Sequence, residues 1–458
     1  MKNIYKTLSL LIITLLAGCQ SGSKSDQGLD YQHPTEMGLE PSTFKMPNPD
    51  DYKLTLDNGL TAFLVTGKEV PLVTVTAYIQ AGTAFDDKAG VAETLASILK
   101  GGCSAATKNF QQEADDRAAQ YGVTMDQEGT TISLNVASED VAWAVTSLSG
   151  ILQSPCINNQ TVAAYKGGSV DNAVNDRSAY DGNLNVAVGL FNKHLYDGHS
   201  YSSGVTAAQA AAVSVGDVTG FYKKYFTPSN VTIGVGGDFE KSVVEKMLTD
   251  RLGEWSGGVR PAIEIATAIS PKNQSEDYTA DKLQSWYVAG HALPMLTAEE
   301  IPALEVMNYI LGGGHFDTRL FKETRDLRGL TNDASGFLTF QQYGPGSYDF
   351  RTYGRPEVLG QLEEIVLAEA TKIKNEEVSD EELMVAQGAL ADGVFEEMFQ
   401  NSHKTAATLA EEFNKYQSFE RLSAYPDRVR AVTKADVKDA ANKYLLPDQF
   451  LTVRVISK

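Results

Sequence analysis

The chain has 458 residues, too many for one ordinary domain and enough for two domains with sizeable cores. Hydrophobic residues make up 42% and charged residues 21%, as in ordinary globular proteins, which argues against extended disorder in the body of the chain. The formal net charge of −20 argues against nucleic-acid binding, because affinity for phosphate backbones comes from lysine and arginine. The negative charge can serve to keep the protein soluble; the alternative explanation is that the protein prefers basic peptides.

The first residues have the pattern of a targeting segment. Two lysines precede an apolar run that ends in Leu-Ala-Gly-Cys at Cys19. This pattern resembles a bacterial lipobox, in which cleavage before the cysteine leaves Cys19 lipidated; the alternative is an ordinary signal peptide with an incidental cysteine. Gln20, where Asp would favour the inner membrane, implies an outer membrane lipoprotein that faces the periplasm. We expect residues 1–19 to be a lipoprotein signal peptide and residues 20–50 a tether.

The two other cysteines are Cys103 and Cys156. An oxidising compartment permits a disulfide between them, but their separation does not establish that they pair. Two buried free thiols are slightly favoured, because a chain of this size does not need a covalent cross-link.

Regular secondary structure is expected from residue 52 onward. Alternating apolar residues on both sides of Asn58-Gly59 predict a β-hairpin over residues 54–65. Strands are further expected over residues 73–81 and 130–136, and helices over residues 90–100, 110–121, 141–152 and 159–175. Because the strands and helices do not alternate strictly, an α+β fold is favoured over a doubly wound one.

Six residues recur at a constant offset of 219 positions, which indicates a duplicated domain. Val213, Asp217, Val218, Lys224, Tyr225 and Pro228 match Val432, Asp436, Val437, Lys443, Tyr444 and Pro447. Both copies predict a capped helix, a proline and a strand, the strands over residues 231–235 and 450–455. Glycines and prolines over residues 254–277 predict a linker, so we expect domains at residues 51–258 and 275–458.

Residues 90–102, Gly-Val-Ala-Glu-Thr-Leu-Ala-Ser-Ile-Leu-Lys-Gly-Gly, predict a short apolar helix closed by glycines. Its frame resembles the active-site helix of the pitrilysin-like (insulinase) zinc metallopeptidases, where Gly-x-Ala-His-x-x-Glu-His precedes apolar residues and Lys-Gly. In that family the two histidines lie on one helix face and bind zinc, while the glutamate activates a metal-bound water. Here Glu93, Ala96 and Ser97 occupy these three places.

The resemblance extends over the mature chain from about residue 50 to the end. It implies two homologous metallopeptidase-like α/β-roll domains that form a clamshell around a peptide. The family's third zinc ligand aligns near Asp171 and Asn172, where no paired glutamates stand, and no two histidines lie one helical turn apart. We therefore expect no metal or other cofactor in this chain, and zinc only in a partner subunit.

Residues 311–330 resemble the glycine-rich loop of the family, with its Arg-Leu-Phe and Arg-x-x-x-Gly-Leu segments. The three glycines are Gly312, Gly313 and Gly314. They permit close backbone approach where an extended peptide docks, although a tight turn before a helix would explain them about as well. In active members an arginine and a tyrosine seven residues later hold the substrate near the metal. Those places are Arg325 and Asn332, and because asparagine lacks the phenol, the substrate-binding pair is half intact.

Taken together, the sequence favours an inactive pitrilysin-like lipoprotein that pairs with a zinc-bearing homologue in a heterodimer. In periplasmic peptide proteolysis it would contribute chamber wall and substrate contacts, with a lipid anchor in the membrane. The first alternative is a stand-alone lipoprotein that binds peptides or assists envelope assembly. An active metallopeptidase with an unorthodox metal site ranks last.

Overall fold

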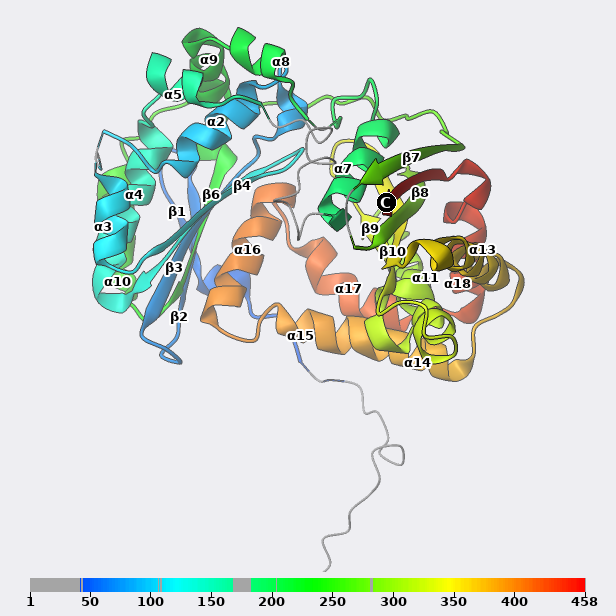
Figure 1. Ribbon diagram of the computed structural model, residues 1–458. Helices are drawn as coiled ribbons and strands as arrows, with labels where there is room; N and C mark the ends of the chain where they lie inside the picture. Colours follow the sequence, from blue (N-terminus) through cyan, green and yellow to red (C-terminus); the bar gives the residue numbers. More distant parts are fainter. Residues whose placement is uncertain are drawn as a thin grey trace, which may run out of the picture. The chain divides into compact units, whose positions relative to one another are not determined.

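The computed structural model describes residues 42, 44–105, 107, 109–167, 183–202, 204–280 and 283–457. Thr43–Lys458 form one compact unit that contains two β-sheets, each with its own set of helices (Figure 1). In the described part of the chain, no helix is long and apolar enough to cross a membrane.

The first sheet has six strands in the order β1-β2-β6-β3-β5-β4. They are β1 (Lys53–Thr55), β2 (Thr61–Thr66), β3 (Leu72–Ile79), β4 (Gln120–Met125), β5 (Thr130–Ala137) and β6 (Val231–Gly237). β2 and β6 are parallel, and all other neighbours are antiparallel. The predicted hairpin is confirmed: β1 pairs with β2, Gly59 has a φ of 89°, and Asn58 Oδ1 accepts the Leu60 N–H.

The second sheet repeats this arrangement with five strands in the order β7-β11-β8-β10-β9. They are β7 (Gln274–Ala280), β8 (Ser285–Leu293), β9 (Ala334–Thr339), β10 (Gly346–Gly354) and β11 (Leu451–Ser457). The order corresponds to β2-β6-β3-β5-β4 of the first sheet, and its parallel pair, β7 and β11, takes the place of β2 and β6. The α+β fold and the duplication expected from the sequence are thus confirmed.

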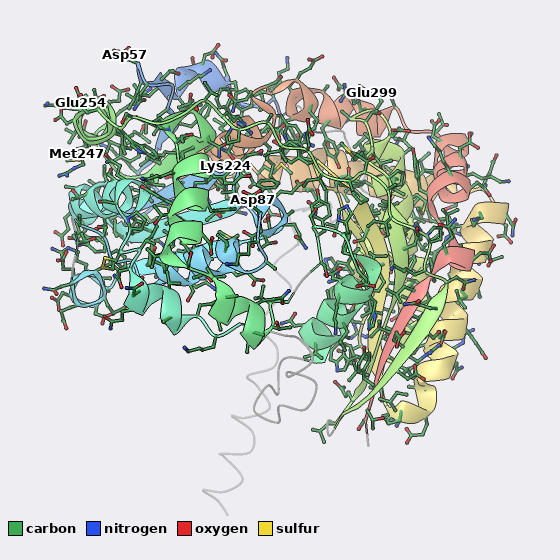
Figure 2. The ribbon with its side chains drawn as sticks, turned by 90° about the horizontal axis from the view of Figure 1, so that it is seen from above. Asp57, Asp87, Lys224, Met247, Glu254 and Glu299 are labelled. Atoms are coloured by element: carbon green, nitrogen blue, oxygen red, sulfur yellow. A yellow bond between two sulfur atoms is a disulfide. The ribbon has the colours of Figure 1, made fainter. Side chains whose placement is uncertain are left out.

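Helices of the first half cover one face of the first sheet. They are α2 (Val91–Lys100), α3 (Phe110–Asp116), α4 (Val141–Gln153), α5 (Asn159–Ala164), α8 (Ala207–Ala212), α9 (Val215–Tyr225) and α10 (Lys241–Leu252). α4 packs on β3 and β5, and α2 packs on β4 and α9. Figure 2 shows Lys224 of α9 beside Asp87, which precedes α2; their Nζ and Oδ2 atoms are 3.7 Å apart.

Helices of the second half surround the second sheet. They are α11 (Ile301–Asn308), α12 (Arg319–Phe321), α13 (Leu359–Asn375), α14 (Asp380–Gly388), α15 (Phe395–Glu397), α17 (Glu420–Arg430) and α18 (Lys434–Tyr444). α9 and α18 are the two repeated helices, and each begins with a capping box, at Ser214 and Thr433. Each is followed by a proline turn and the strand that pairs in parallel, as the repeat predicts.

Two helices are exchanged between the halves. α7 (Asn183–Leu195), from the first half of the chain, packs on β8 and β11, whereas α16 (Ser402–Tyr416), from the second half, packs on β2, β3 and β6. Glycines in β6 let α16 approach closely: a Cβ on Gly236 would lie 2.5 Å from the Ser402 carbonyl oxygen, and one on Gly234 would lie 2.7 Å from that of Ala406. Each half therefore completes the core of the other, and the predicted domain boundary stays a prediction.

Two predicted helices are shorter than the sequence suggested. α3 ends at Asp116 rather than near Tyr121, because Ala118 adopts a left-handed φ of 51° and the chain then enters β4. α5 ends at Ala164, where Tyr165 turns to an extended conformation. The rest of the helix predicted over residues 159–175 falls partly outside the described residues.

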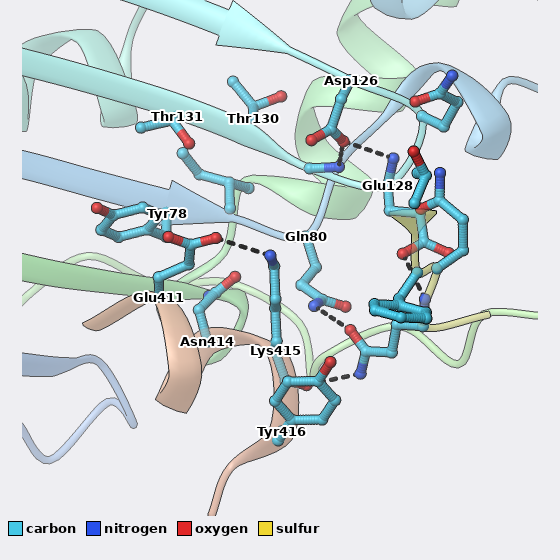
Figure 3. A pocket seen from close by; sticks show the side chains of 17 residues that line it. Tyr78, Gln80, Asp126, Glu128, Thr130, Thr131, Glu411, Asn414, Lys415 and Tyr416 are labelled. Carbon is cyan, nitrogen blue, oxygen red and sulfur yellow. Dashed lines mark hydrogen bonds and ion pairs between the residues drawn. The ribbon is translucent and has the colours of Figure 1, made fainter. Parts of the chain in front are cut away.

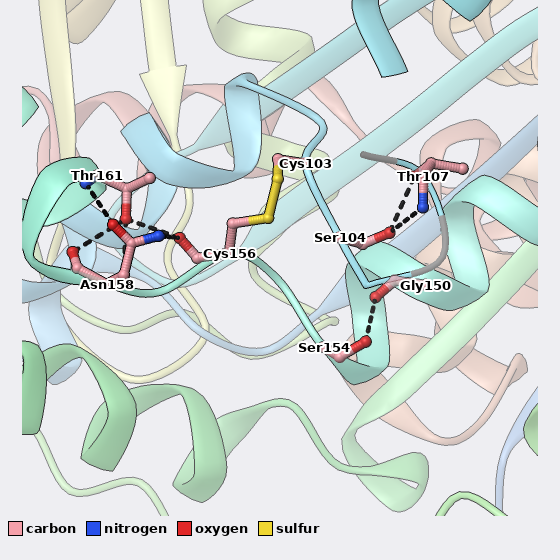
Figure 4. Close-up of a disulfide and its surroundings, with 8 residues drawn as sticks. All are labelled: Cys103, Ser104, Thr107, Gly150, Ser154, Cys156, Asn158 and Thr161. Carbon is pink, nitrogen blue, oxygen red and sulfur yellow. Dashed lines mark hydrogen bonds between the residues drawn. A yellow bond between two sulfur atoms is a disulfide. The ribbon is translucent and has the colours of Figure 1, made fainter. Parts of the chain in front are cut away.

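The two cysteines are joined, contrary to the slight preference for free thiols. A disulfide links Cys103, directly after α2, to Cys156, between α4 and α5 (Figure 4). The backbones of the two cysteines are also hydrogen-bonded to each other, because the Cys156 N–H donates to the Cys103 carbonyl oxygen at 3.1 Å. Spacing in the sequence could not reveal this contact, which depends on how α2 and α4 pack around the sheet.

Candidate functional site

The helix that resembles the zinc helix is well formed. Asp86 caps its first turn, accepting the Gly90 N–H at 3.1 Å and the Ala92 N–H at 2.7 Å. Gly90 itself has a φ of 95°, in the left-handed region where glycine is favoured. The local sequence thus builds the expected helix, although its motif positions carry Glu93, Ala96 and Ser97.

The three zinc-motif positions hold a glutamate, an alanine and a serine in place of the two histidines and the glutamate of the motif. Ala96 is buried and has no ligand atom, and Ser97 offers only a hydroxyl. Glu93 is already engaged, because its Oε2 accepts the Tyr165 hydroxyl at 2.9 Å. Among the described residues, no group of three or more His, Cys, Asp or Glu side chains could hold a metal ion. The predicted third-ligand positions, Asp171 and Asn172, lie outside the described residues.

Two carboxyl groups beside this helix have raised pKa values. Burial raises the pKa of Asp86 to about 7, against the opposing effect of its N–H donors, and the nearby charge of Glu93 adds to the rise. Burial also raises the pKa of Glu93, although the hydrogen bond from Tyr165 lowers it in part. The surroundings of both carboxyl groups therefore favour the protonated form more than water does.

The glycine segment forms a π-helical turn, Tyr309–Gly313, that packs against β9. A Cβ on Gly312 would lie 2.7 Å from the Gly336 nitrogen, and one on Gly314 would lie 2.6 Å from the Tyr309 ring. A Cβ on Gly313 would likewise lie 2.5 Å from the Asn308 amide nitrogen. The three predicted glycines thus allow close internal packing. The residue that follows them, His315, has a left-handed φ of 56°.

Arg325 stands on an exposed aromatic surface. It belongs to a second π-helical turn, Lys322–Asp326, and its guanidinium carbon lies 4.8 Å from the centre of the Phe321 ring and 5.7 Å from that of Phe316. Phe316 is 70% exposed, and Arg325 forms no ion pair with any described residue. Asn332 is also exposed, in the connection before β9. No described contact joins the side chains of Arg325 and Asn332, so their roles in substrate binding stay predictions.

A neighbouring arginine fixes this segment to the rest of the second half. Arg319 donates from Nε and Nη2 to the two carboxylate oxygens of Glu382 on α14, at 2.7 and 3.0 Å. Burial alone would raise the pKa of Glu382, but the hydrogen bonds from Arg319 and Ser379 hold it at about 2. The two residues are far apart in the sequence, and no spacing rule pointed to them.

Sequence reasoning also missed a polar network where the two halves meet. Glu128, in the β4–β5 turn, accepts the backbone N–H groups of Gln342 and Tyr343, both at 2.8 Å, and the hydroxyl of Tyr201. Gln80, after β3, donates from Nε2 to Gln342 Oε1 at 2.8 Å. This network borders a cavity of about 340 Å³ (Figure 3). A Glu in a turn gives no signal of such a role, because its partners lie from 73 to 215 residues away in the sequence.

His199 connects two loops of the structure. Its Nδ1 accepts the Tyr201 N–H at 3.0 Å, which leaves a proton on Nε2 to donate to the Ala266 carbonyl oxygen at 2.7 Å. The imidazole therefore ties two connecting segments together.

Comparison with known proteins gives a consistent picture. Residues 212–390 match the family model described as the peptidase M16 inactive domain, whereas no protein with a curated description matches the chain. The solved peptidase M16 inactive domain from Pseudomonas fluorescens is 19% identical, with a TM-score of 0.74 over 89% of this chain and 98% of that one. A protease from Helicobacter pylori is 16% identical, with a TM-score of 0.73 over 88% and 98% of the two chains.

The periplasmic protease PqqL from Escherichia coli is a longer relative in fold. It is 14% identical, with a TM-score of 0.64, over 95% of this chain but only 49% of its own length. Its fold is shared, while the zinc motif at Glu93, Ala96 and Ser97 is absent here. The matched segment, residues 212–390, and the fold shared with these structures support a degenerate member of the pitrilysin-like, or M16, peptidase family.

Proposed function

We propose that this chain is the non-catalytic subunit of a two-chain peptidase. A zinc-bearing homologue supplies the metal site, and this chain contributes a wall of the peptide chamber and contacts to the substrate. The observation that carries the proposal is the contrast between the two halves. The zinc helix keeps its shape but lacks its ligands, whereas Arg325 stands exposed and without an ion-pair partner among the described residues.

The length of the E. coli protease supports pairing. That protein is described as a periplasmic protease, and this chain corresponds to 49% of it. A chain of the present length therefore accounts for half of such an enzyme. A second chain of the same fold would supply the other half, including the zinc site.

We also propose an outer membrane lipoprotein that faces the periplasm, anchored through Cys19. The Cys103–Cys156 disulfide supports this location, because disulfides persist in oxidising compartments such as the bacterial periplasm. Zinc would be present in the partner, and this chain would bind none.

The first experiment is affinity capture of the tagged protein from gently solubilised membranes, with mass spectrometry of whatever accompanies it in near-equal amount. We expect a homologue with the His-x-x-Glu-His motif. Capture of the protein alone, or with unrelated envelope proteins, would overturn the two-chain peptidase and leave a stand-alone lipoprotein that binds peptides or assists envelope assembly.

The role of Arg325 is tested in the purified complex by peptide cleavage. We expect Arg325→Ala to lower kcat/KM about tenfold, as loss of a charged hydrogen bond would, without weakening subunit association. Arg328→Ala is the matched control, because its guanidinium is already paired with Glu323 on the same turn. Equal effects of the two substitutions would show that Arg325 has no special contact with substrate.

A further inference from the structure

The cavity beside the Glu128 network is separate from the zinc helix and from Arg325. Its walls are the end of β3, the turn between β4 and β5, the segment after β9 and the last turn of α16 (Figure 3). Small-molecule sites in proteins typically occupy roughly 300–1,000 Å³. At about 340 Å³, this cavity has room for one small ligand or for one side chain of a bound peptide.

The charges that line the cavity make it negative. Three carboxylates, Asp126, Glu128 and Glu411, stand against one ammonium, Lys415. Lys415 Nζ lies 2.7 Å from Oε1 of Glu411, and Glu128 is occupied by the network between the halves. Because the lining is left with more negative than positive charge, an anionic ligand is disfavoured and a cation is favoured.

Two carboxylate oxygens are left for a ligand. Asp126 uses Oδ1 to accept the N–H groups of Glu128 and Gly129, at 2.8 and 2.7 Å. No described residue donates a hydrogen bond to its Oδ2, nor to Oε2 of Glu411. Both side chains are partly exposed to the cavity, so a ligand can reach these oxygens.

Asn414 adds an amide oxygen to the cavity lining. This residue is only 4% exposed, and its Nδ2 donates to the Asn230 carbonyl oxygen at 3.2 Å and to the Thr232 hydroxyl at 3.3 Å. These bonds direct Oδ1 to the opposite side, into the cavity (Figure 3), where it accepts no hydrogen bond from a described residue. An amide oxygen at the cavity wall can accept a hydrogen bond from a ligand that carries an N–H donor.

Two aromatic rings complete the lining. Tyr78, on β3, and Tyr416, at the end of α16, both line the cavity, and aromatic faces attract organic cations. Burial and the charge of Glu411 raise the pKa of Tyr78, so its phenol stays neutral. The cavity thus combines acceptors, negative charge and aromatic surface.

We propose that this cavity binds an organic cation with several N–H donors, a primary ammonium or a guanidinium group, through Asp126, Glu411 and Asn414. The cation belongs either to a free polyamine or to a lysine or arginine side chain of a peptide. The second source would make basic peptides the substrate class, and only that part rests on the proposed function. Since the cavity lies between the two halves, an occupied cavity links the β4–β5 turn to α16.

The test is isothermal titration of the purified soluble protein, without any partner subunit. The probes are spermidine and the capped tripeptide acetyl-Ala-Lys-Ala-amide, with acetyl-Ala-Gln-Ala-amide as the uncharged control. We expect one or both cations to bind with a Kd below about 1 mM, and the glutamine peptide not to bind. Binding of spermidine alone points to a free polyamine, and binding of the lysine peptide points to basic peptides.

The variants Glu411→Gln and Asp126→Asn remove charge while keeping size. Each should weaken cation binding about tenfold, the effect of losing one charged hydrogen bond. Glu397→Gln is the matched control, since Glu397 also pairs with a lysine, Lys404, but lies outside the cavity. Thermal unfolding of each variant shows whether it remains folded. The proposal is overturned if no cation binds to the folded wild-type protein, or if all three variants bind as the wild type does.

Discussion

The disulfide gives the sharpest prediction about stability. The double variant Cys103→Ser with Cys156→Ser should unfold more easily than the oxidised wild type, while the native fold stays unchanged. Both cysteines are replaced together because a single substitution would leave a reactive thiol behind. A soluble form that begins after Cys19 avoids the lipid anchor and any third thiol.

The size of the effect follows from the loop that the cross-link closes. The two cysteines are 53 residues apart. In the chain-entropy account, a cross-link over a loop of this length removes conformational entropy of the unfolded chain equivalent to about 4 kcal/mol at 25 °C. The neighbouring backbone hydrogen bond between Cys156 and Cys103 does not need the disulfide and should survive. The expected loss therefore arises chiefly in the unfolded state.

Urea-induced unfolding followed by circular dichroism measures this loss. The oxidised wild type should be more stable than the double variant by about 4 kcal/mol, and reduction of the wild type should abolish the difference. A difference below about 1 kcal/mol would refute the reasoning, because it would mean that the cross-link hardly restricts the unfolded chain. A changed near-ultraviolet spectrum of the folded variant would instead show that the disulfide shapes the native packing.

Three further predictions concern packing, pH and the lost zinc motif. Gly236→Ala forces a methyl group against the backbone of α16 and should cost about 2 kcal/mol in urea unfolding, whereas Gly220→Ala, with open space around it, should be neutral or stabilising. Glu305 belongs to α11, and burial raises its pKa to about 7. In the folded protein its carboxyl group therefore keeps a proton that the unfolded chain releases near pH 4. The free energy of unfolding consequently falls as the pH rises from about 4 to 7. Glu305→Gln should therefore be more stable than the wild type by about 3 kcal/mol at pH 8 and equally stable near pH 4 in urea titrations. Equal stability of the two proteins at both pH values would contradict this. Restoring the zinc motif should give no robust, chelator-sensitive cleavage of peptides, since a carboxylate at position 96 would be buried and no paired glutamates stand where the third zinc ligand of the family aligns. That triple variant is Glu93→His, Ala96→Glu and Ser97→His.

The sequence predicted those features whose causes are local. The Asn58-Gly59 turn, the alternation along β5 and the capping boxes of α9 and α18 each depend on residues within a few positions of one another. The absence of the zinc ligands is likewise visible in one short stretch. Because the duplication preserves such local patterns, it too could be read from the chain, and with it the α+β fold.

Where the local signals failed, a long-range contact decided the structure. α3 reads as a longer helix from its apolar spacing, but the pairing of β4 with β5 requires Tyr121 as a strand residue. Tertiary packing overrides propensity here, because the ladder and the burial of its side chains outweigh a few more helical residues.

The sequence by itself determined the duplicated α+β architecture and the absence of the His-x-x-Glu-His zinc motif at Glu93–Ser97. Only the tertiary structure decided that Cys103 pairs with Cys156, that α7 and α16 are exchanged, and that Asp126, Glu411 and Asn414 line one cavity. The physical reason is distance along the chain. Hairpins, caps and helix faces are set by near neighbours, whereas these contacts join residues tens to hundreds of positions apart and arise only when the two sheets pack with their helices.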